Sequence, residues 1–165
     1  MDTSDPWIIF NKDGFCNHCS DFIEKKLPSI TNHNSDQSDL IRMFEEIKSQ
    51  RRKGTKYDVL VGISGGVDSS YVALLAMEIG LNPLCVHFDN GWNSDIAVRN
   101  IRNIIKFTEF DYDTVVINWP EFKSLQRAYI RAGVVDIEAL TDHAIFASMM
   151  KISKKENIKY ITPKK

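Results

Sequence analysis

The sequence is short of cysteine, of long apolar runs and of a secretory leader, and each shortage excludes a class of protein. There are three cysteines among 165 residues, too few for the disulfide framework of a small secreted domain. No apolar run approaches the roughly 20 residues that cross a bilayer, and the first residues lack the basic and then apolar order of a signal peptide. We therefore expect a cytoplasmic protein that does not contact a membrane.

Net charge is also nearly absent, because 21 Lys and Arg stand against 22 Asp and Glu and leave a formal charge of -1. A chain-wide binder of nucleic acid gains affinity from an excess of basic residues. The composition thus argues against nucleic acid as a partner. With 43% hydrophobic and 26% charged residues, the chain is typical of one globular domain.

From residue 57 onward, short apolar runs alternate with longer amphipathic segments, which indicates βαβ units and a parallel sheet. The predicted strands are 58–63, 84–88, 114–117 and 159–162. The predicted helices are a lead-in helix over 36–53 and then 69–79, 95–107, 121–132 and 141–156. The expected fold is α/β, an open, mainly parallel, doubly wound sheet.

Residues 1–35 carry turn-forming and polar residues, so we expect an irregular N-terminal appendage ahead of a main domain over 36–165. Within it, Cys16 and Cys19 have the spacing of half a tetrahedral Zn²⁺ site, to which His18 or His33 could add a ligand. Cys85 falls in a predicted buried strand, where a thiol serves as a small apolar side chain.

The segment between the first strand and its helix is the most informative, because amides at a helix N-terminus bind anions beside the end of a parallel strand. Two adjacent glycines let the backbone approach a phosphate, three serines add hydroxyl donors, and an aspartate could hold a Mg²⁺ that bridges phosphate oxygens. The candidate phosphate-binding residues are Ser64, Gly65, Gly66, Val67, Asp68, Ser69 and Ser70, with Asp68 as the Mg²⁺ ligand.

Other interpretations of this segment fit less well or leave an alternative open. A Walker loop needs a Lys that the segment lacks, and the dinucleotide fingerprint needs a different glycine spacing. The G-x-S-x-G elbow of a hydrolase does match, with Ser64 as nucleophile and with Asp136 or Asp142 and His143 downstream. A Gly-Gly turn that merely starts a helix is the simplest alternative.

The run from Ser64 to Ser69, SGGVDS, resembles the pyrophosphate loop of the PP-loop ATP pyrophosphatases, which include GMP synthetase, NAD synthetase and tRNA thiolases. The resemblance implies the adenine nucleotide alpha hydrolase (HUP-like) fold, with ATP and Mg²⁺ as cofactors. It also implies an adenylating enzyme, which attaches AMP to a substrate oxygen and lets a nitrogen or sulfur nucleophile displace it.

Further segments resemble one branch of that group, the N-acetyl sugar amidotransferases of lipopolysaccharide and surface glycan biosynthesis. The resemblance implies that the acetamido group of a nucleotide-linked N-acetyl sugar becomes an acetamidine, with ammonia from a partner glutaminase. The segments are DTSDP from Asp2, GFCNHC from Gly14, VHFDNGWN from Val86, VINW from Val116, DIE from Asp136 and TDHAI from Thr141.

Three further residues are candidates on this branch. Asp89 ends the second strand, where its carboxylate could accept from ribose hydroxyls or the adenine edge, although Asp-Asn-Gly also forms a simple turn. The match places Asp142 and His143 in the active crevice, with His143 suited to proton exchange. Alternatively, Thr141 caps the following helix and Asp142 only complements its dipole.

Alternative functions remain within and outside this class. A tRNA thiolase needs a basic face and a reactive cysteine, a ligase like NAD or GMP synthetase amidates another acceptor, and a nucleotide-binding chain has no turnover. The sequence ends just after the fourth predicted strand, where an open sheet ordinarily continues. We therefore expect a chain truncated at its C-terminal side, which lacks part of the acceptor site.

Overall fold

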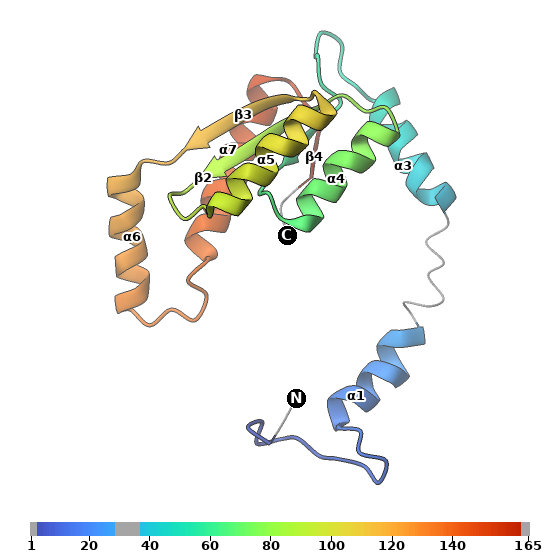
Figure 1. Cartoon of the computed structure of the whole chain (residues 1–165), viewed down its shortest axis with the longest axis vertical. Coiled ribbons are helices and arrows are strands. Elements are labelled where there is room, and N and C mark those ends of the chain that lie inside the picture. The colour runs from blue at the N-terminus through green and yellow to red at the C-terminus, as the bar shows by residue number, and fades with distance from the viewer. Residues whose placement is uncertain (1–2, 29–36, 163–165) are drawn as a thin grey trace. The chain divides into compact units, whose positions relative to one another are not determined.

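The computed structural model describes residues 3–28 and 37–162. It divides the chain into two compact units, Met1–Met43 and Phe44–Lys165. The boundary predicted between residues 35 and 36 lies outside the described residues, as does His33. Each unit has its own local structure, and the second holds the sheet (Figure 1).

The N-terminal unit contains more helix than the sequence predicts. An antiparallel bridge joins Phe10 and Cys16, and the chain then enters α1 (Asn17–Asp21) and the short π-helix η1 (Phe22–Lys26). The expectation of an irregular segment is therefore wrong for these ten positions, 17–26. An ion pair of 2.7 Å between Lys25 Nζ and Asp21 Oδ1, four residues apart, supports this turn of helix without any apolar periodicity.

The second unit is built on a parallel sheet of four strands in the order β3-β2-β1-β4 (Figure 1). The strands are β1 (Val59–Gly62), β2 (Pro83–Asp89), β3 (Asp111–Val116) and β4 (Tyr160–Thr162). Val59 pairs with Pro83 of β2 on one side and with Tyr160 of β4 on the other. The chain therefore winds from β1 toward β3 and returns beyond β1, which confirms the predicted α/β fold.

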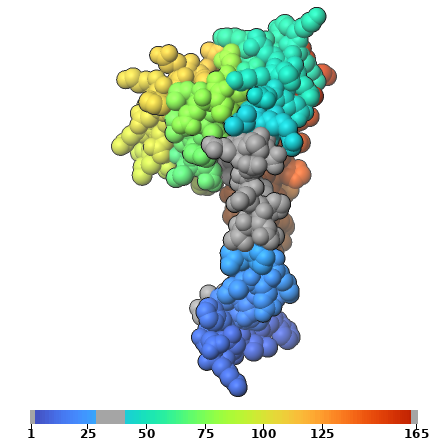
Figure 2. Space-filling view, turned by 90° about the vertical axis from the view of Figure 1, so that its right-hand side faces the viewer, coloured from blue at the N-terminus to red at the C-terminus, as the bar shows by residue number. Residues whose placement is uncertain are grey.

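Helices cover both faces of the sheet, as a parallel sheet requires. Alternation along β1 sends Val59 and Val61 to one core and Leu60 to the other. The first core contains residues of α3 (Gln37–Ser49) from Phe44 on, α4 (Val67–Glu78) and α5 (Asp95–Thr108), whose surfaces run from cyan to yellow in Figure 2. The second contains residues of α7 (Ala139–Lys155).

Two boundaries differ from the prediction in ways that matter for the site. Helix α4 begins at Val67, so Val67 and Asp68 belong to its first turn. Strand β3 begins at Asp111, three residues before the predicted start. This edge strand is largely exposed, so it tolerates polar residues and shows no apolar pattern over its first half. Helix α6 (Trp119–Arg131) follows with Pro120 in its first turn, a favoured place for proline.

No helix in the ranges that the structure covers is both long and apolar enough to cross a membrane. The strands instead direct attention to one edge of the sheet. The carboxyl ends of β1 and β2 lie side by side, and each leads into a loop rich in Gly and polar residues. These two loops form the candidate site.

Candidate functional site

The loop after β1 is held by its own serines. The amide of Ser64 donates to Ser69 Oγ at 3.2 Å, and the two hydroxyl oxygens lie 3.1 Å apart. Ser69 Oγ donates to the Gly66 carbonyl at 3.2 Å, and Ser70 Oγ donates to the same carbonyl at 2.8 Å. Ser69 is buried, so these bonds fix the turn from inside. The hydroxyls that the sequence suggests as phosphate donors therefore also form the loop's internal scaffold.

Gly65 is the point at which this loop meets α5. Its φ of +75° lies in the left-handed region, and a Cβ added there would lie 2.2 Å from the carbonyl oxygen of Ala97. The side chain of Asn100 donates to the Gly65 carbonyl at 2.9 Å. Only glycine satisfies both the conformation and the contact, so α5 holds the loop against the start of α4.

The same turn leaves a row of amides open. In the described part of the chain, no acceptor takes the N–H of Gly65, Val67, Asp68 or Ser69, whereas Ser70 N begins the helical pattern with Gly66 O at 3.1 Å. The side chains of Val67 and Asp68 are exposed. These donors and the positive end of the α4 dipole create a site for an anion at the end of β1.

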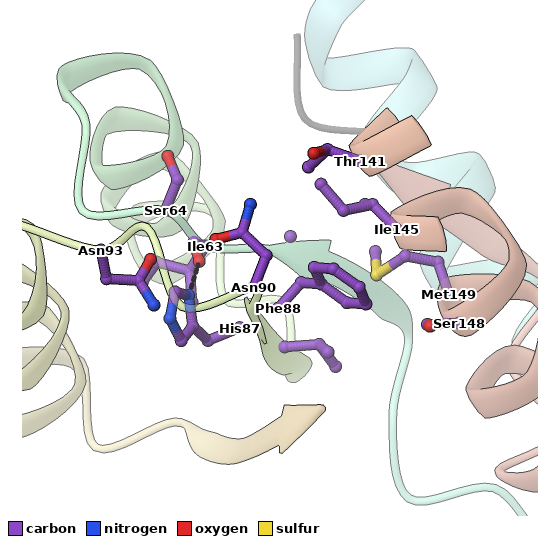
Figure 3. A pocket seen from close by; sticks show the side chains of 12 residues that line it. Ile63, Ser64, His87, Phe88, Asn90, Asn93, Thr141, Ile145, Ser148 and Met149 are labelled. Atoms are coloured by element: carbon purple, nitrogen blue, oxygen red, sulfur yellow. Dashed lines mark hydrogen bonds between the residues drawn. The ribbon is translucent and has the colours of Figure 1, made fainter. Parts of the chain in front are cut away.

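A small cavity of about 80 Å³ lies beside this loop, between the ends of β1 and β2 and helix α7 (Figure 3). Ser64, Asn90 and Asn93 line it from the loops, and Thr141 and Ser148 line it from α7. Most of the remaining wall is apolar, contributed by Ile63, Val86, Phe88, Ile145 and Met149. The mixture of apolar wall and a few polar groups resembles the lining of a ligand pocket, although about 80 Å³ holds only part of an organic ligand.

His87 also lines this cavity, and it was not among the candidate residues predicted from the sequence. Its side chain is buried, and Nδ1 donates to the carbonyl oxygen of Ile63, the residue that enters the phosphate loop, at 3.0 Å. A histidine inside an otherwise apolar strand was the available signal. Asn100 was missed as well, because a polar residue on an exposed helix gives no sequence signal for the loop that it contacts.

The loop after β2 uses its polar groups internally. Asp89 Oδ1 accepts from the Gly91 amide at 2.9 Å and from Asn93 Nδ2 at 2.8 Å. Asn90 Oδ1 accepts from the Trp92 amide at 3.1 Å. The carboxylate of Asp89 therefore holds the loop in shape, while Asn90 and Asn93 extend toward the cavity (Figure 3).

The two candidate residues of α7 line a different groove. Asp142 and His143 are exposed and border a groove with Phe146 and Ile161, whereas the neighbouring Thr141 is buried and borders the cavity. The structure thus brings Thr141, and not these two residues, to the cavity beside Ser64. A hydrolase would use a Ser-His hydrogen bond, but within residues 3–28 and 37–162 Ser64 Oγ bonds only to Ser69 Oγ and the Gly66 amide.

The cysteines fall into two environments. The Sγ atoms of Cys16 and Cys19 lie 3.4 Å apart, and hydrogen bonding from the Cys19 amide lowers the pKa of Cys16. His18 Nε2 lies 2.6 Å from Asp5 Oδ2. In the described ranges, no group of three or more metal-ligating side chains lies together. Zinc binding by Cys16 and Cys19 stays a prediction. Burial raises the pKa of Cys85, inside β2, to about 12.

Comparison with known proteins agrees with this geometry. The sequence profile of the NAD synthase family matches residues 27–154. An uncharacterised protein of Methanocaldococcus jannaschii is 28% identical over 127 residues, which cover 72% of this chain and 44% of that protein. A glutamine-hydrolyzing GMP synthase of Chlorobium luteolum is 37% identical over 73 residues, 44% of this chain and 14% of the synthase.

Solved structures share the fold at low sequence identity. NMN synthetase from Francisella tularensis has a TM-score of 0.56 at 15% identity, over 77% of this chain and 52% of that chain. Glutamine-dependent NAD+ synthetase from Acinetobacter baumannii, solved with ADP, has a TM-score of 0.56 at 18% identity, over 75% of this chain and 24% of that chain. This chain thus spans about half or less of the length of each of these four proteins.

The match to the NAD synthase profile over residues 27–154, together with the parallel sheet and the SGGVDS turn that runs into the first turn of α4, assigns the chain to the PP-loop ATP pyrophosphatase superfamily. Within that superfamily, the profile match over most of its length shows that the chain belongs to the NAD synthase family.

Proposed function

We propose that this chain is the ATP-binding part of an ATP-dependent ligase that adenylates an oxygen of its acceptor and replaces it with ammonia. The row of open amides at the start of α4, beside the cavity, is the observation that carries the proposal. Those donors match the charge that develops on pyrophosphate as it leaves, so the loop stabilises the leaving group electrostatically. No covalent nucleophile is needed, because binding the nucleotide and the acceptor side by side at this edge of the sheet brings the reacting groups together.

Magnesium fits this loop through one carboxylate. Asp68 is exposed in the first turn of α4, next to the open amides, and Mg²⁺ in phosphate sites binds through one or two carboxylates and the phosphate oxygens. The ion would neutralise charge on the departing pyrophosphate. Asp68 would hold it, and the loop amides would orient the phosphates.

Ammonia is the favoured nucleophile. Among the relatives, one structure is an NH3-dependent NAD synthetase from Campylobacter jejuni, and the GMP synthase is glutamine-hydrolyzing. Cys85, the thiol inside β2, offers no sulfur chemistry, because it is fully buried and its raised pKa keeps it protonated. A partner glutaminase is thus the proposed source of nitrogen, and a thiolase role is disfavoured.

For the acceptor we propose the acetamido group of a nucleotide-linked N-acetyl sugar, converted to an acetamidine during lipopolysaccharide or surface glycan synthesis. The segments VHFDNGWN and VINW, which carry the resemblance to sugar amidotransferases, supply Asn90, Asn93 and two tryptophans around the site. Asp142 and His143 are proposed to act on the acceptor from their groove on α7. Ile145 and Met149 border both this groove and the cavity, so the two lie next to each other.

Product analysis tests the proposal. The chain is incubated with ATP, Mg²⁺, UDP-N-acetylglucosamine and ammonium, and the nucleotides and sugars are separated by mass spectrometry. We expect AMP, pyrophosphate and a sugar lighter by one mass unit, because oxygen is replaced by NH. ADP as the nucleotide product would contradict adenylation altogether.

The family match favours a second acceptor, a carboxylate as in NAD synthesis. Nicotinic acid adenine dinucleotide in place of the sugar separates the two candidates. Formation of NAD with AMP would assign the chain to that activity, whereas AMP formation only with the acetamido sugar would assign it to sugar amidation.

A further inference from the structure

Two tryptophans pair at the carboxyl ends of β2 and β3. Trp92, from the loop after β2, and Trp119, from the first turn of α6, meet edge to face with ring centroids 6.0 Å apart. Behind them, the buried ring of Phe122 lies 6.2 Å from Trp119. Trp92 keeps 68% of its surface exposed and Trp119 keeps 40%. This pair, called the aromatic platform below, is thus supported from within and open to solvent.

The loop after β2 is shaped around this platform. Gly91 has a φ of +78°, and a Cβ added there would lie 3.1 Å from the Trp119 ring. The hydrogen bonds of Asp89 and Asn90 to the following amides hold Trp92 in its orientation. A further bond of 3.1 Å from the Ile117 amide to the Asp89 carbonyl ties the end of β3 to that of β2. These local contacts hold the loop, and with it the exposed Trp92, in one conformation.

The platform and the cavity share this loop. Asn90 and Asn93 line the cavity, while Trp92, between them in the chain, contributes to the platform. Polar side chains also flank Trp119 at the start of α6, where Asn118 Nδ2 donates to Glu121 Oε2 at 3.2 Å. An exposed aromatic surface with amide and carboxylate groups at its rim therefore adjoins the proposed nucleotide site.

The chemistry of this surface suits a pyranose ring. One face of a pyranose presents apolar C–H bonds that pack on an indole, and its hydroxyls exchange hydrogen bonds with amide and carboxylate groups. The small cavity walled by Val86, Phe88 and Ile145 directly adjoins Ser64 of the phosphate loop, so the nucleotide is expected on that side and the platform is left to the other reactant. We propose that Trp92 and Trp119 bind the sugar ring of the acceptor, an inference that rests on the proposed sugar amidation.

Saturation-transfer NMR on the full chain tests this assignment with methyl N-acetyl-β-D-glucosaminide as the probe and ATP in the same sample. The methyl glycoside contains no nucleobase, so its signals report the sugar ring alone. We expect saturation of the pyranose protons in the parent chain. In Trp92→Ala the affinity for the sugar should fall about fivefold, which corresponds to the loss of one aromatic contact of about 1 kcal/mol. Trp92 is the safer variant because its ring is largely exposed.

Trp7→Ala is the matched control, since Trp7 is a highly exposed tryptophan of the N-terminal unit. It should leave the sugar signals unchanged. Absence of sugar signals in the parent chain, or equal signals in Trp92→Ala, would overturn the assignment. A loss confined to the adenine protons of ATP would also overturn it, because the platform would then bind the nucleobase.

A second variant and a kinetic measurement separate this inference from the proposed function. Trp119→Phe keeps an aromatic ring beside Gly91 and should weaken sugar binding less than Trp92→Ala. In turnover assays, Trp92→Ala should raise the KM for the sugar and leave the KM for ATP unchanged. Sugar binding that depends on Trp92, without any AMP formed from acetamido sugars, would reject sugar amidation and retain the platform as a sugar site.

Discussion

The loops after β1 and β2 have similar compositions but use their polar groups in opposite ways. In the first, the serine hydroxyls bond inward, and as a result the backbone amides of the α4 start remain open. In the second, the Asp89 carboxylate bonds inward, and the loop exposes a tryptophan between the two asparagines that line the cavity. The comparison teaches that the residue which looks like a ligand in a sequence is often the one that holds the real ligands in place.

The largest expected effect comes from filling the contact between the first loop and α5. Gly65→Ala forces a side chain into a left-handed conformation and against the Ala97 carbonyl. We expect the free energy of unfolding to fall by about 3 kcal/mol, the sum of conformational strain and overpacking. Urea denaturation followed by circular dichroism measures it.

Gly66→Ala is the matched control, because its Cβ would meet only Ser64 Oγ at 3.5 Å. It should cost about 1 kcal/mol, as expected for alanine at a helix N-cap. Equal losses in the two variants would mean that the contact with α5 does not determine the conformation of the loop.

Removing an inward-facing hydroxyl should have the next largest effect. Ser69→Ala leaves the Ser64 amide and the loop without their buried partner, so we expect a loss of about 2 kcal/mol in unfolding free energy. ATP affinity, measured by calorimetry, should fall about tenfold as the open amides lose their alignment. Ser70→Ala should have little effect, since the Gly66 carbonyl keeps the Ser70 amide. A larger effect of Ser70→Ala would reverse the roles assigned to the two serines.

Asp89 provides a test of the second loop. Asp89→Asn retains an oxygen that can accept from the Gly91 amide, whereas Asp89→Ala removes it. We expect ATP affinity within about twofold of the parent in the first variant and about fivefold weaker in the second, for the loss of one or two loop hydrogen bonds. If both variants lose affinity equally, the charge itself contacts the nucleotide and the two loops act alike.

The smallest expected effect concerns thiol chemistry beneath the second loop. Burial raises the pKa of Cys85 to about 12, so iodoacetamide at pH 8 should leave this residue of β2 unmodified. Cys19 is exposed and should react. Peptide mass spectrometry measures both, and EDTA reports zinc if it increases labelling of Cys16 and Cys19. Rapid labelling of Cys85 would favour a thiolase over an amidotransferase.

Much of the fold was predictable from sequence, because apolar periodicity indicates the strands and helices and adjacent glycines indicate the phosphate loop. Short apolar runs located the strands, and the SGGVDS motif located the turn from β1 into the first turn of α4. The polar edge strand β3 was recognised only in part, since Asp111 pairs with Lys56 and Tyr57 and leaves no apolar pattern. Helix η1 was missed for a related reason, because its apolar residues are exposed.

The site was predictable only where its residues are consecutive in the sequence. The phosphate loop is local, and its residues follow one another. Contacts made by distant residues, such as Asn100 with Gly65 and His87 with Ile63, depend on how α5 and β2 pack and leave no trace in spacing. The prediction that Asp142 and His143 line the active crevice is of this non-local kind and stays a prediction; the structure places both in a groove of α7, and Thr141 in the neighbouring cavity.

The bond between His87 and the Ile63 carbonyl fixes more than a ring orientation. A carbonyl oxygen only accepts, so Nδ1 must carry the hydrogen, and in the neutral ring Nε2 is left with its lone pair. The backbone at the entry to the phosphate loop therefore sets the tautomer of this buried ring, and the second ring nitrogen is left as an acceptor.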